Sequence, residues 1–272
     1  MTPDVDQMLI RNENVICFLT LNKGKGHLSL NCVSYFYPWL KFKKMDGFKV
    51  YRLGIIDYQN ALKLQLSLLE KRMRDETEDV LVLLQHPPTF TMGRSGKTEH
   101  LLSNIEELKK RGIHFEEISR GGDITYHGPG QLVGYPIIDL NKFKRDIHQY
   151  LRNIEEMLIL TLSDFKIRAE RKKGLTGVWV NDEKVASIGV GVKRWITYHG
   201  FALNVNTDLS YFDMIIPCGI QGAKMTSMKI ILGDIEDINL IKVESSIINA
   251  FSKLFNRVLL TEITSDDLSL YT

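Results

Sequence analysis

Cys218, Lys184 and the segment from Arg120 to His127 carry the residue types with which this 272-residue chain could do chemistry. Cys218 follows Pro217 and precedes Gly219, so a turn could present its sulfur as a nucleophile. A free cysteine can equally be a small buried hydrophobic residue, and the neighbouring residues leave both interpretations open. Nucleophilic chemistry would also require a group that converts the thiol into a thiolate.

Lys184 is the candidate for that group. In the segment 183–192, strand alternation predicts that Lys184 heads an apolar row that includes Ala186 and Ile188. The opposite row, which includes Ser187 and Gly189, is nearly bare of large side chains. Burial disfavours the ammonium form of a lysine, so Lys184 could take a proton from a thiol. The alternative is a lysine at a hairpin turn that extends its ammonium group into water.

The segment 120–140 is the densest functional signal, because it holds five glycines and two prolines in RGGDITYHGPGQLVGYPIIDL. Glycine costs about 1 kcal/mol and proline about 3 kcal/mol inside a helix, so the pattern predicts a binding loop followed by a strand at 132–140. Arg120 could bind a phosphate or carboxylate, or could tie the loop to a carbonyl oxygen. His127 and His199 could each act as a base or hold a turn by hydrogen bonds.

Composition narrows the class of protein. The 35 basic and 33 acidic residues give a formal charge of +2, too small to indicate a nucleic-acid partner. No apolar run approaches the roughly 20 residues of a membrane-spanning helix, so we expect no membrane partner. Three cysteines without a CxxC pattern favour neither disulfides nor a metal site, and indicate an intracellular, reducing compartment. The cytoplasm and an organelle such as a plastid or mitochondrion remain open.

The hydrophobic pattern becomes regular after residue 47, where strands alternate with helices before a run of period two begins. Such an order predicts an α/β or α+β domain, with a mixed sheet flanked by helices. Residues 1–47 form an N-terminal extension whose order and targeting role the sequence leaves open. The expected strands lie at 48–55 and 80–84, and a hairpin or meander is expected at 176–205. The expected helices lie at 58–74, 146–164 and 241–255, and Asp57 caps the first of them. A further helix begins at a Ser103–Glu106 capping box and is ended by Gly112.

Two of these helices have a predicted inner face. In the helix at 58–74 the spacing selects Leu62, Leu66 and Leu69. In the helix at 146–164 it selects Ile147, Leu151, Ile154, Leu158 and Thr161.

Taken together, these segments resemble the lipoyl(octanoyl) transferase family, the octanoyl-carrier-protein:protein octanoyltransferases of lipoic acid synthesis. The resemblance covers roughly residues 48 to 230, and its motifs come in the family's order. The matching segments are 120–140, GLTGVWV at 174–180, EKVASIGVGV at 183–192, TYHGFALNVNTDL at 197–209 and IIPCGI at 215–220.

The resemblance implies a fold shared with biotin and lipoate protein ligases, with residues 48–272 as the catalytic domain of an acyltransferase. It makes Cys218 the acyl-thioester nucleophile and Lys184 the partner that favours its thiolate. It assigns the octanoyl-binding surface to Arg120, Gly121, Gly122, Asp123, Ile124, Thr125, Tyr126, His127, Ser187, Ile188, Gly189, Gly200, Phe201 and Ala202.

The implied reaction moves an octanoyl group from octanoyl-acyl-carrier protein to Cys218, and then to a lysine of a lipoyl domain. The implied acceptors are 2-oxoacid dehydrogenase E2 subunits and the glycine cleavage H protein, and the enzyme is expected to be a monomer. The phosphopantetheine thioester arrives on the carrier protein, so no separate cofactor or metal is expected. Two alternatives remain: an ATP-dependent lipoate or octanoate ligase, which would need no cysteine, and a non-catalytic module that binds acyl-carrier protein or lipoyl domains.

Overall fold

The computed structural model of the chain describes residues 9–12, 15–22, 27–33, 46–233 and 238–265, which fall into two units, Met1–Lys44 and Met45–Thr272. The first unit contains an antiparallel sheet of three strands. They are β1 (Leu9–Asn12), β2 (Val15–Asn22) and β3 (His27–Val33). Much of the predicted extension lies outside the described residues, so its order and targeting role stay predictions.

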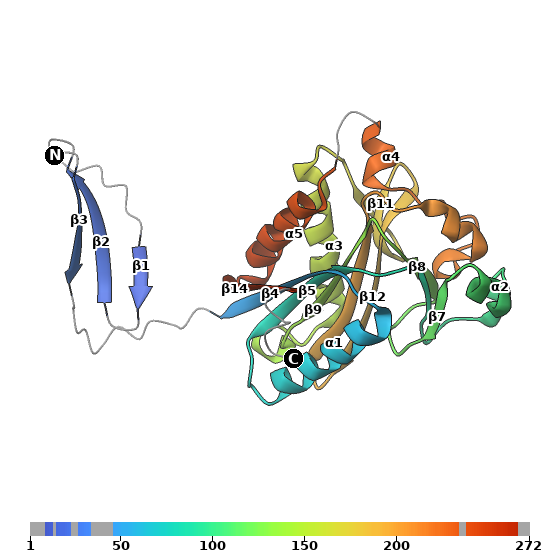
Figure 1. Ribbon diagram of the computed structural model, residues 1–272, viewed down its shortest axis with the longest axis horizontal. Helices are drawn as coiled ribbons and strands as arrows, with labels where there is room; N and C mark the ends of the chain where they lie inside the picture. Colours follow the sequence, from blue (N-terminus) through green and yellow to red (C-terminus); the bar gives the residue numbers. More distant parts are fainter. Residues whose placement is uncertain (1–8, 13–14, 23–26, 34–45, 234–237, 266–272) are drawn as a thin grey trace. The chain divides into compact units, whose positions relative to one another are not determined.

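A mixed sheet of eight strands forms the centre of the second unit (Figure 1). The strands follow the order β10-β11-β12-β13-β9-β5-β4-β14. The pairs β14–β4 and β4–β5 are parallel, whereas the other neighbouring pairs are antiparallel. Their bounds are β4 (Gly47–Ile55), β5 (Asp79–Gln85), β9 (Gln131–Ile137), β10 (Glu170–Lys172), β11 (Leu175–Val180), β12 (Glu183–Lys193), β13 (Ile196–Asn204) and β14 (Val258–Thr264).

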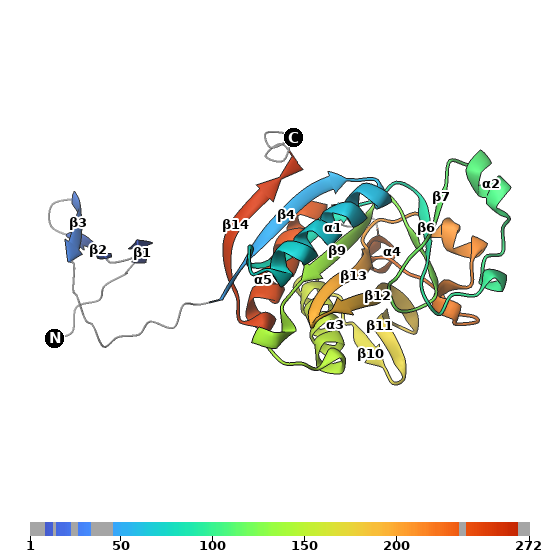
Figure 2. The same cartoon turned by 90° about the horizontal axis from the view of Figure 1, so that it is seen from below.

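Helices cover both faces of this sheet, which confirms the predicted α/β class. Figures 1 and 2 show α3 (Ile147–Asp164) and α5 (Leu240–Phe255) on one face and α1 (Tyr58–Met73) on the other. Each face has its own apolar core, and the strands at 79–85 and 131–137 contribute to both. A short helix, α4 (Met228–Leu232), lies between β13 and α5 in the chain. Within the described ranges, every helix is too short or too polar to cross a membrane.

A second, smaller sheet lies beside the main one and corrects the prediction of one long binding loop. Its strands run in the order β7 (His114–Glu117), β6 (Thr89–Met92) and β8 (Ile124–His127), with α2 (Ile105–Lys110) nearby. A third of the segment predicted as loop, 120–131, is therefore a buried strand. Its apolar side chains pack with Phe90 and Phe212 in a third core, which glycine content alone does not reveal.

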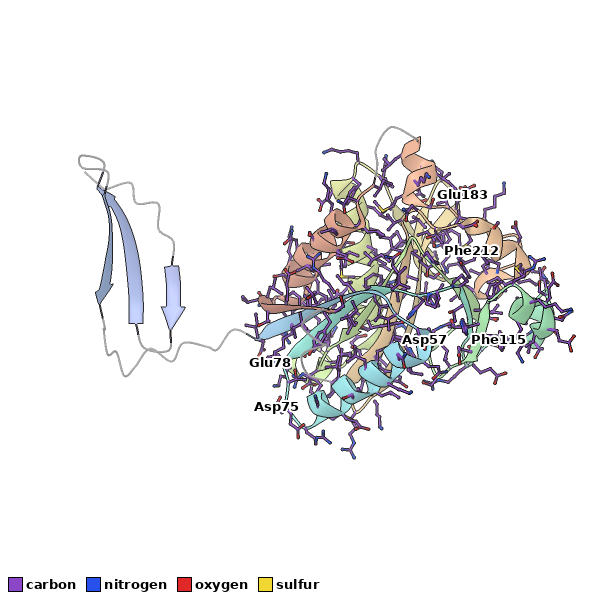
Figure 3. All side chains as sticks on the ribbon, viewed as in Figure 1. Asp57, Asp75, Glu78, Phe115, Glu183 and Phe212 are labelled. Carbon is purple, nitrogen blue, oxygen red and sulfur yellow. The ribbon has the colours of Figure 1, made fainter. Side chains whose placement is uncertain are left out.

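Helix α1 begins where the sequence predicts and buries Leu69 as expected, but the rest of its buried face is shifted from the predicted one. Asp57 caps it by accepting hydrogen bonds from two backbone N–H groups in the first turn (Figure 3). The predicted inward position of Leu66 is wrong, because this residue is 42% exposed. The buried face includes the polar residues Gln65 and Arg72, each of which forms hydrogen bonds inside the protein. A face predicted from the leucines alone is therefore rotated about the helix axis relative to the buried one.

The starts of two other helices also differ from the sequence pattern. Asn104, and not Ser103, caps α2, since its side chain accepts the N–H of Glu107 at 2.8 Å. Ile147, predicted to face inward, is 39% exposed in the first turn of α3. The helix turns toward the core only from Tyr150 onward.

A buried ion-pair cluster joins α1, the start of β5 and the start of β14. Asp79 accepts from Nε of Arg72 at 2.9 Å and from Nε of Arg257 at 2.9 Å, and it also accepts the backbone N–H of Asp139. All three charged side chains of these ion pairs are almost completely buried. Each charge is compensated, and removing one partner from a buried pair leaves the other with an uncompensated desolvation cost.

We expect Asp79→Asn to destabilise the fold by about 3 kcal/mol, because two buried arginines lose the one fully buried carboxylate that they share. Urea denaturation measures this loss in the free energy of unfolding. Glu76→Gln, which removes the exposed partner of Arg74, is the matched control and should change little. Equal effects of the two substitutions would contradict the role given to the cluster.

Candidate active site

The sulfur of Cys218 is presented by a 3₁₀ turn, Pro217–Gly219, in which the cysteine itself has φ 56° and ψ 20°. A non-glycine residue in this left-handed region is uncommon and is often found at functional sites. The N–H of Gly219 donates to Ile216 O at 3.1 Å and closes the turn. A Cβ on Gly219 would lie 2.6 Å from Oδ2 of Asp123, so the turn packs directly against that carboxylate.

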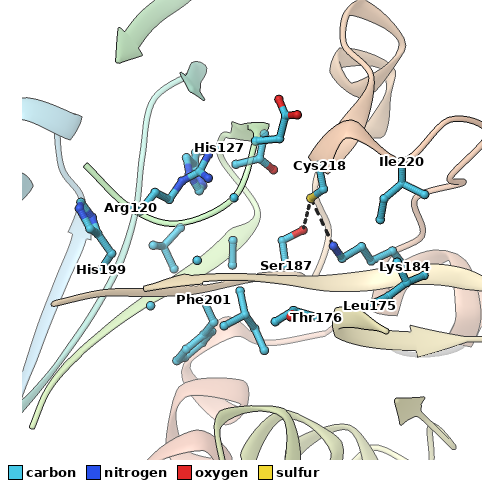
Figure 4. A pocket seen from close by; sticks show the side chains of 18 of the residues that line it. Arg120, His127, Leu175, Thr176, Lys184, Ser187, His199, Phe201, Cys218 and Ile220 are labelled. Carbon is cyan, nitrogen blue, oxygen red and sulfur yellow. Dashed lines mark hydrogen bonds between the residues drawn. The ribbon is translucent and has the colours of Figure 1, made fainter. Parts of the chain in front are cut away.

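Two side chains of β12 reach this sulfur. Nζ of Lys184 donates to Sγ of Cys218 at 3.2 Å, and Oγ of Ser187 lies 3.8 Å from the same sulfur (Figure 4). Lys184 is only 2% exposed, so its amine contacts the sulfur largely shielded from water. The structure thus brings together the two residues that the sequence singled out for nucleophilic chemistry.

A β-bulge allows the lysine and the serine three residues later to share one face. Trp179 of β11 pairs with Lys184, but the residue before it pairs with Ala186, two positions further along β12. Val185 is therefore an extra residue that shifts the alternation by one. The expectation that Lys184 lies in the apolar row with Ala186 is wrong for this reason.

Lys184 is held through its backbone as well as its side chain. Its N–H donates to Lys224 O at 2.8 Å, and its carbonyl accepts from the N–H of Thr226 at 3.0 Å. Its stem crosses Gly177, where a Cβ would lie 2.6 Å from Cε of the lysine. The segment after the cysteine turn and a bare position on β11 together fix the course of the lysine.

A cavity of about 220 Å³ opens beside these groups and contains most of the predicted binding surface. Figure 4 shows Cys218, Lys184 and Ser187 gathered together, with Arg120 and His199 on the other side. The predicted surface residues that line the cavity are Arg120, Gly122, Asp123, Thr125, His127, Ser187, Ile188, Gly189, Gly200, Phe201 and Ala202.

Three predicted residues do not line this cavity. On β8, Ile124 and Tyr126 face the third core, while the alternate side chains face the cavity. The ring of Tyr126 stacks on Tyr211 with centroids 4.6 Å apart. Gly121 instead donates its N–H to Val190 O at 3.0 Å, and so joins the loop to β12.

The cavity also has walls that motif reasoning missed. They come from the first turn of α1, from β9 and from the start of β11, which no single stretch of sequence connects. The segment GLTGVWV at 174–180 matches the family, but no local pattern in the sequence marks its residues as cavity walls. The additional lining residues are Tyr58, Val133, Tyr135, Gly174, Leu175, Thr176 and Ile220, and His199, which the sequence already singled out, lines the cavity as well.

A directed chain of hydrogen bonds fixes His127. Nη2 of Arg120 donates to the carbonyl and the hydroxyl of Thr91, and Nε2 of His127 lies 3.2 Å from that hydroxyl. Nδ1 of His127 bonds Oε1 of Gln131 at 2.8 Å, while the amide nitrogen of Gln131 donates elsewhere. His127 therefore carries its proton on Nδ1 and accepts at Nε2. Burial lowers its pKa well below the ordinary value. The neutral ring therefore uses both nitrogens for hydrogen bonds within the protein.

Arg120 is buried without an ion pair among the described residues. Its hydrogen bonds go to the carbonyl and hydroxyl of Thr91 and to its neighbour's carbonyl, Gly121 O. Burial lowers its pKa from the ordinary value, but an arginine remains charged. Of the two roles that the sequence left open, the geometry shows the loop-holding one, and it leaves a positive charge beside the cavity.

Comparisons with known proteins identify the family of this chain. Residues 57–252 match the model of the lipoyl protein ligase A/B catalytic domain. The octanoyltransferase of Christiangramia forsetii is 47% identical, over 76% of this chain and 95% of its own length. That of a Thermoanaerobacter species is 46% identical, over 81% and 95%. The chain belongs to the octanoyltransferase family. It is therefore an acyltransferase that acts in protein lipoylation, as the sequence resemblance implies.

Solved structures show the same fold as this octanoyltransferase. A lipoate-protein ligase A bound with ATP superposes with a TM-score of 0.64, at 17% identity, over 83% of this chain and 92% of its own. A bi-partite lipoate protein ligase from Thermoplasma acidophilum gives 0.62, at 19% identity, over 83% and 90%. The predicted lipoate-ligase-like sheet is confirmed, and at these identities the likeness concerns the fold alone.

His199 is the least satisfied polar side chain of the octanoyltransferase site. It has φ 55°, is 1% exposed, and neither ring nitrogen has a hydrogen-bond partner in the described part of the chain. Its backbone N–H donates to Oε1 of Gln65 at 2.9 Å. Burial, with Arg120 and Arg94 nearby, lowers the pKa of His199 to about 3. In the unfolded chain the His199 ring begins to gain a proton as the pH falls through 6.5. In the folded protein the ring is still neutral at that pH.

This depressed pKa gives a stability that is present above pH 6.5 and lost as the pH falls toward 3. His199→Asn keeps a residue that tolerates the left-handed backbone but removes the titrating ring. We expect the loss in the free energy of unfolding between about pH 7 and about pH 4 to shrink by about 3 kcal/mol in this variant. Urea denaturation at both pH values measures it. An undiminished acid loss would show that His199 is not kept neutral by the fold.

Proposed function

We propose that Cys218 carries the octanoyl group as a thioester between donor and acceptor. The contact of 3.2 Å between Nζ of Lys184 and Sγ of Cys218, beside a cavity, is the observation that carries this proposal. An ammonium group this close favours the thiolate, which is the nucleophilic form of a cysteine. The left-handed turn at Cys218 presents the sulfur to an incoming thioester.

In the first step the thiolate attacks the carbonyl carbon of an octanoyl thioester. A new carbon–sulfur bond forms to Cys218, and the bond to the sulfur of the donor's phosphopantetheine arm breaks. That sulfur leaves with the electron pair and takes the proton of the Lys184 ammonium, so the arm departs as a thiol. No ATP or metal is required, because a thioester is already activated.

In the second step the neutral ε-amine of an acceptor lysine attacks the octanoyl-Cys218 carbonyl. An amide bond forms and the bond to Cys218 breaks. The proton released by the amine goes to Lys184, which restores the ammonium–thiolate pair. The proposed donor is octanoyl-acyl-carrier protein, and the proposed acceptors are lipoyl domains of 2-oxoacid dehydrogenase E2 subunits and the glycine cleavage H protein.

The cavity supports an extended acyl chain as the transferred group. Gly189 and Gly200 pair across β12 and β13 and line the cavity, while Val133 and Ala202 add apolar wall. A mostly apolar pocket with a few polar groups suits an acyl chain that must be anchored at its carbonyl. A free-acid substrate with ATP, as a ligase would use, is the alternative that the experiments below distinguish.

We expect Cys218→Ser to lose at least about a thousandfold in transfer, because a serine hydroxyl is a far weaker nucleophile beside this lysine. Wild type mixed with octanoyl-acyl-carrier protein and no acceptor should gain the mass of one octanoyl group, and the variant should not. Adding a lipoyl domain should remove that mass. Efficient transfer by an unmodified wild type would disprove the covalent intermediate, and a requirement for ATP with free octanoate would favour a ligase.

We expect Lys184→Met to slow alkylation of Cys218 by iodoacetamide at least about tenfold near neutral pH, since the ammonium that favours the thiolate is gone. Methionine keeps the length and apolar stem of the buried side chain. Lys193→Met, at the exposed end of the same strand, is the matched control. If both variants react like wild type, Lys184 is not the partner of the thiol.

A further inference from the structure

The indole ring of Trp179 lies against two lysine ammonium groups. Nζ of Lys184 is 5.6 Å from the ring centroid, and Nζ of Lys172 is 4.6 Å from it. Trp179 is 2% exposed and pairs directly with Lys184 across β11 and β12. The lysine beside the sulfur of Cys218 is therefore also beside an aromatic face.

An ammonium within about 6 Å of a tryptophan ring is attracted to the negative face of the ring, and more strongly where water is excluded. Lys184 is 2% exposed and has no carboxylate partner among the described residues. Its charge is therefore compensated by the sulfur at 3.2 Å and by the indole. The aromatic face of Trp179 thus lies where it can attract the amine end of this lysine.

Lys172 differs from Lys184 in having its own counter-charge. It forms an ion pair with Asp182, whose pKa this lysine lowers, and its side chain is 26% exposed. Its charge is thus balanced without the ring. Nε1 of Trp179 is buried without a hydrogen-bond partner in the described part of the chain, so hydrogen bonding does not explain why a tryptophan occupies this position.

We propose that Trp179 is a positioning residue that stabilises the ammonium form of Lys184 by a cation–π contact and thereby favours the thiolate of Cys218. This inference rests on the proposed function, because it treats Cys218 and Lys184 as the working pair. It assigns to β11 an electrostatic role in the chemistry in addition to its place in the sheet.

The test measures the rate of iodoacetamide alkylation against pH, in a full-length chain where Cys17→Ser and Cys32→Ser leave Cys218 as the single cysteine. Trp179→Leu removes the aromatic face but keeps an apolar side chain. We expect alkylation on the order of tenfold slower near neutral pH, with wild-type rates once the thiol is fully ionised. Trp179→Phe should restore part of the rate, and Lys172→Gln, the matched lysine control, should not slow it. A folded Trp179→Leu variant with the wild-type profile overturns the proposal.

Fluorinated tryptophans provide a second test that preserves the shape of the core. In a chain with Trp39→Phe and Trp195→Phe, Trp179 is the one remaining tryptophan. Stepwise fluorination weakens the negative face of the ring, so the alkylation rate near neutral pH should fall with each added fluorine. A rate that is independent of fluorination overturns the proposal even if Trp179→Leu fails to fold.

Alkylation reports on the thiol alone, so its result is separate from that of the octanoyl transfer assay. A wild type that never acquires an octanoyl group would refute the proposed function, whatever the alkylation profile. A wild type that is acylated normally, with a profile insensitive to Trp179, would refute only the role of the ring.

Discussion

The structure of the site depends on one contact, in which the amine of an almost completely buried lysine lies 3.2 Å from a sulfur. A lysine that is 2% exposed loses its hydration, and its charged form persists only if the surrounding groups replace the lost water. The bulge at Val185 turns the lysine toward the sulfur, and the pairing of the segment 224–226 with Lys184 fixes its backbone. The eight-stranded sheet supplies the rigid support that this short distance requires.

Hydrogen bonds connect the glycine-rich loop with that lysine. The directed chain from Arg120 reaches Gln131, whose amide donates to Asn204; Asn204 in turn donates to the carbonyl of Thr226, and Thr226 donates to that of Lys184. Each residue of this series bonds to the next, and such networks hold their members in one arrangement. The cavity wall and the amine are therefore parts of one structure, although many residues separate them in the sequence.

The sequence predicted most elements correctly, because helix caps and hydrophobic periods are local signals. Asp57 and the apolar run 80–84 are examples. It failed where tertiary contacts decide: the bulge that moves Lys184 to the other face, the burial of Gln65, and the strand β8 within a glycine-rich segment. Tyr58 could not be assigned to the site, since only the packing of α1 on the sheet brings it to the cavity.

The buried guanidinium of Arg120, which has no ion pair in the described part of the chain, has a consequence for the balance of charge during turnover. In the proposed reaction the thiolate of Cys218 is an anion near both Arg120 and Lys184. Once the sulfur is acylated it is neutral, and Lys184 has already given its proton to the departing thiol, so the guanidinium of Arg120 faces an uncharged pair. Its positive charge disfavours the return of a proton to the lysine from solvent, so the covalent intermediate keeps the base that the incoming amine needs.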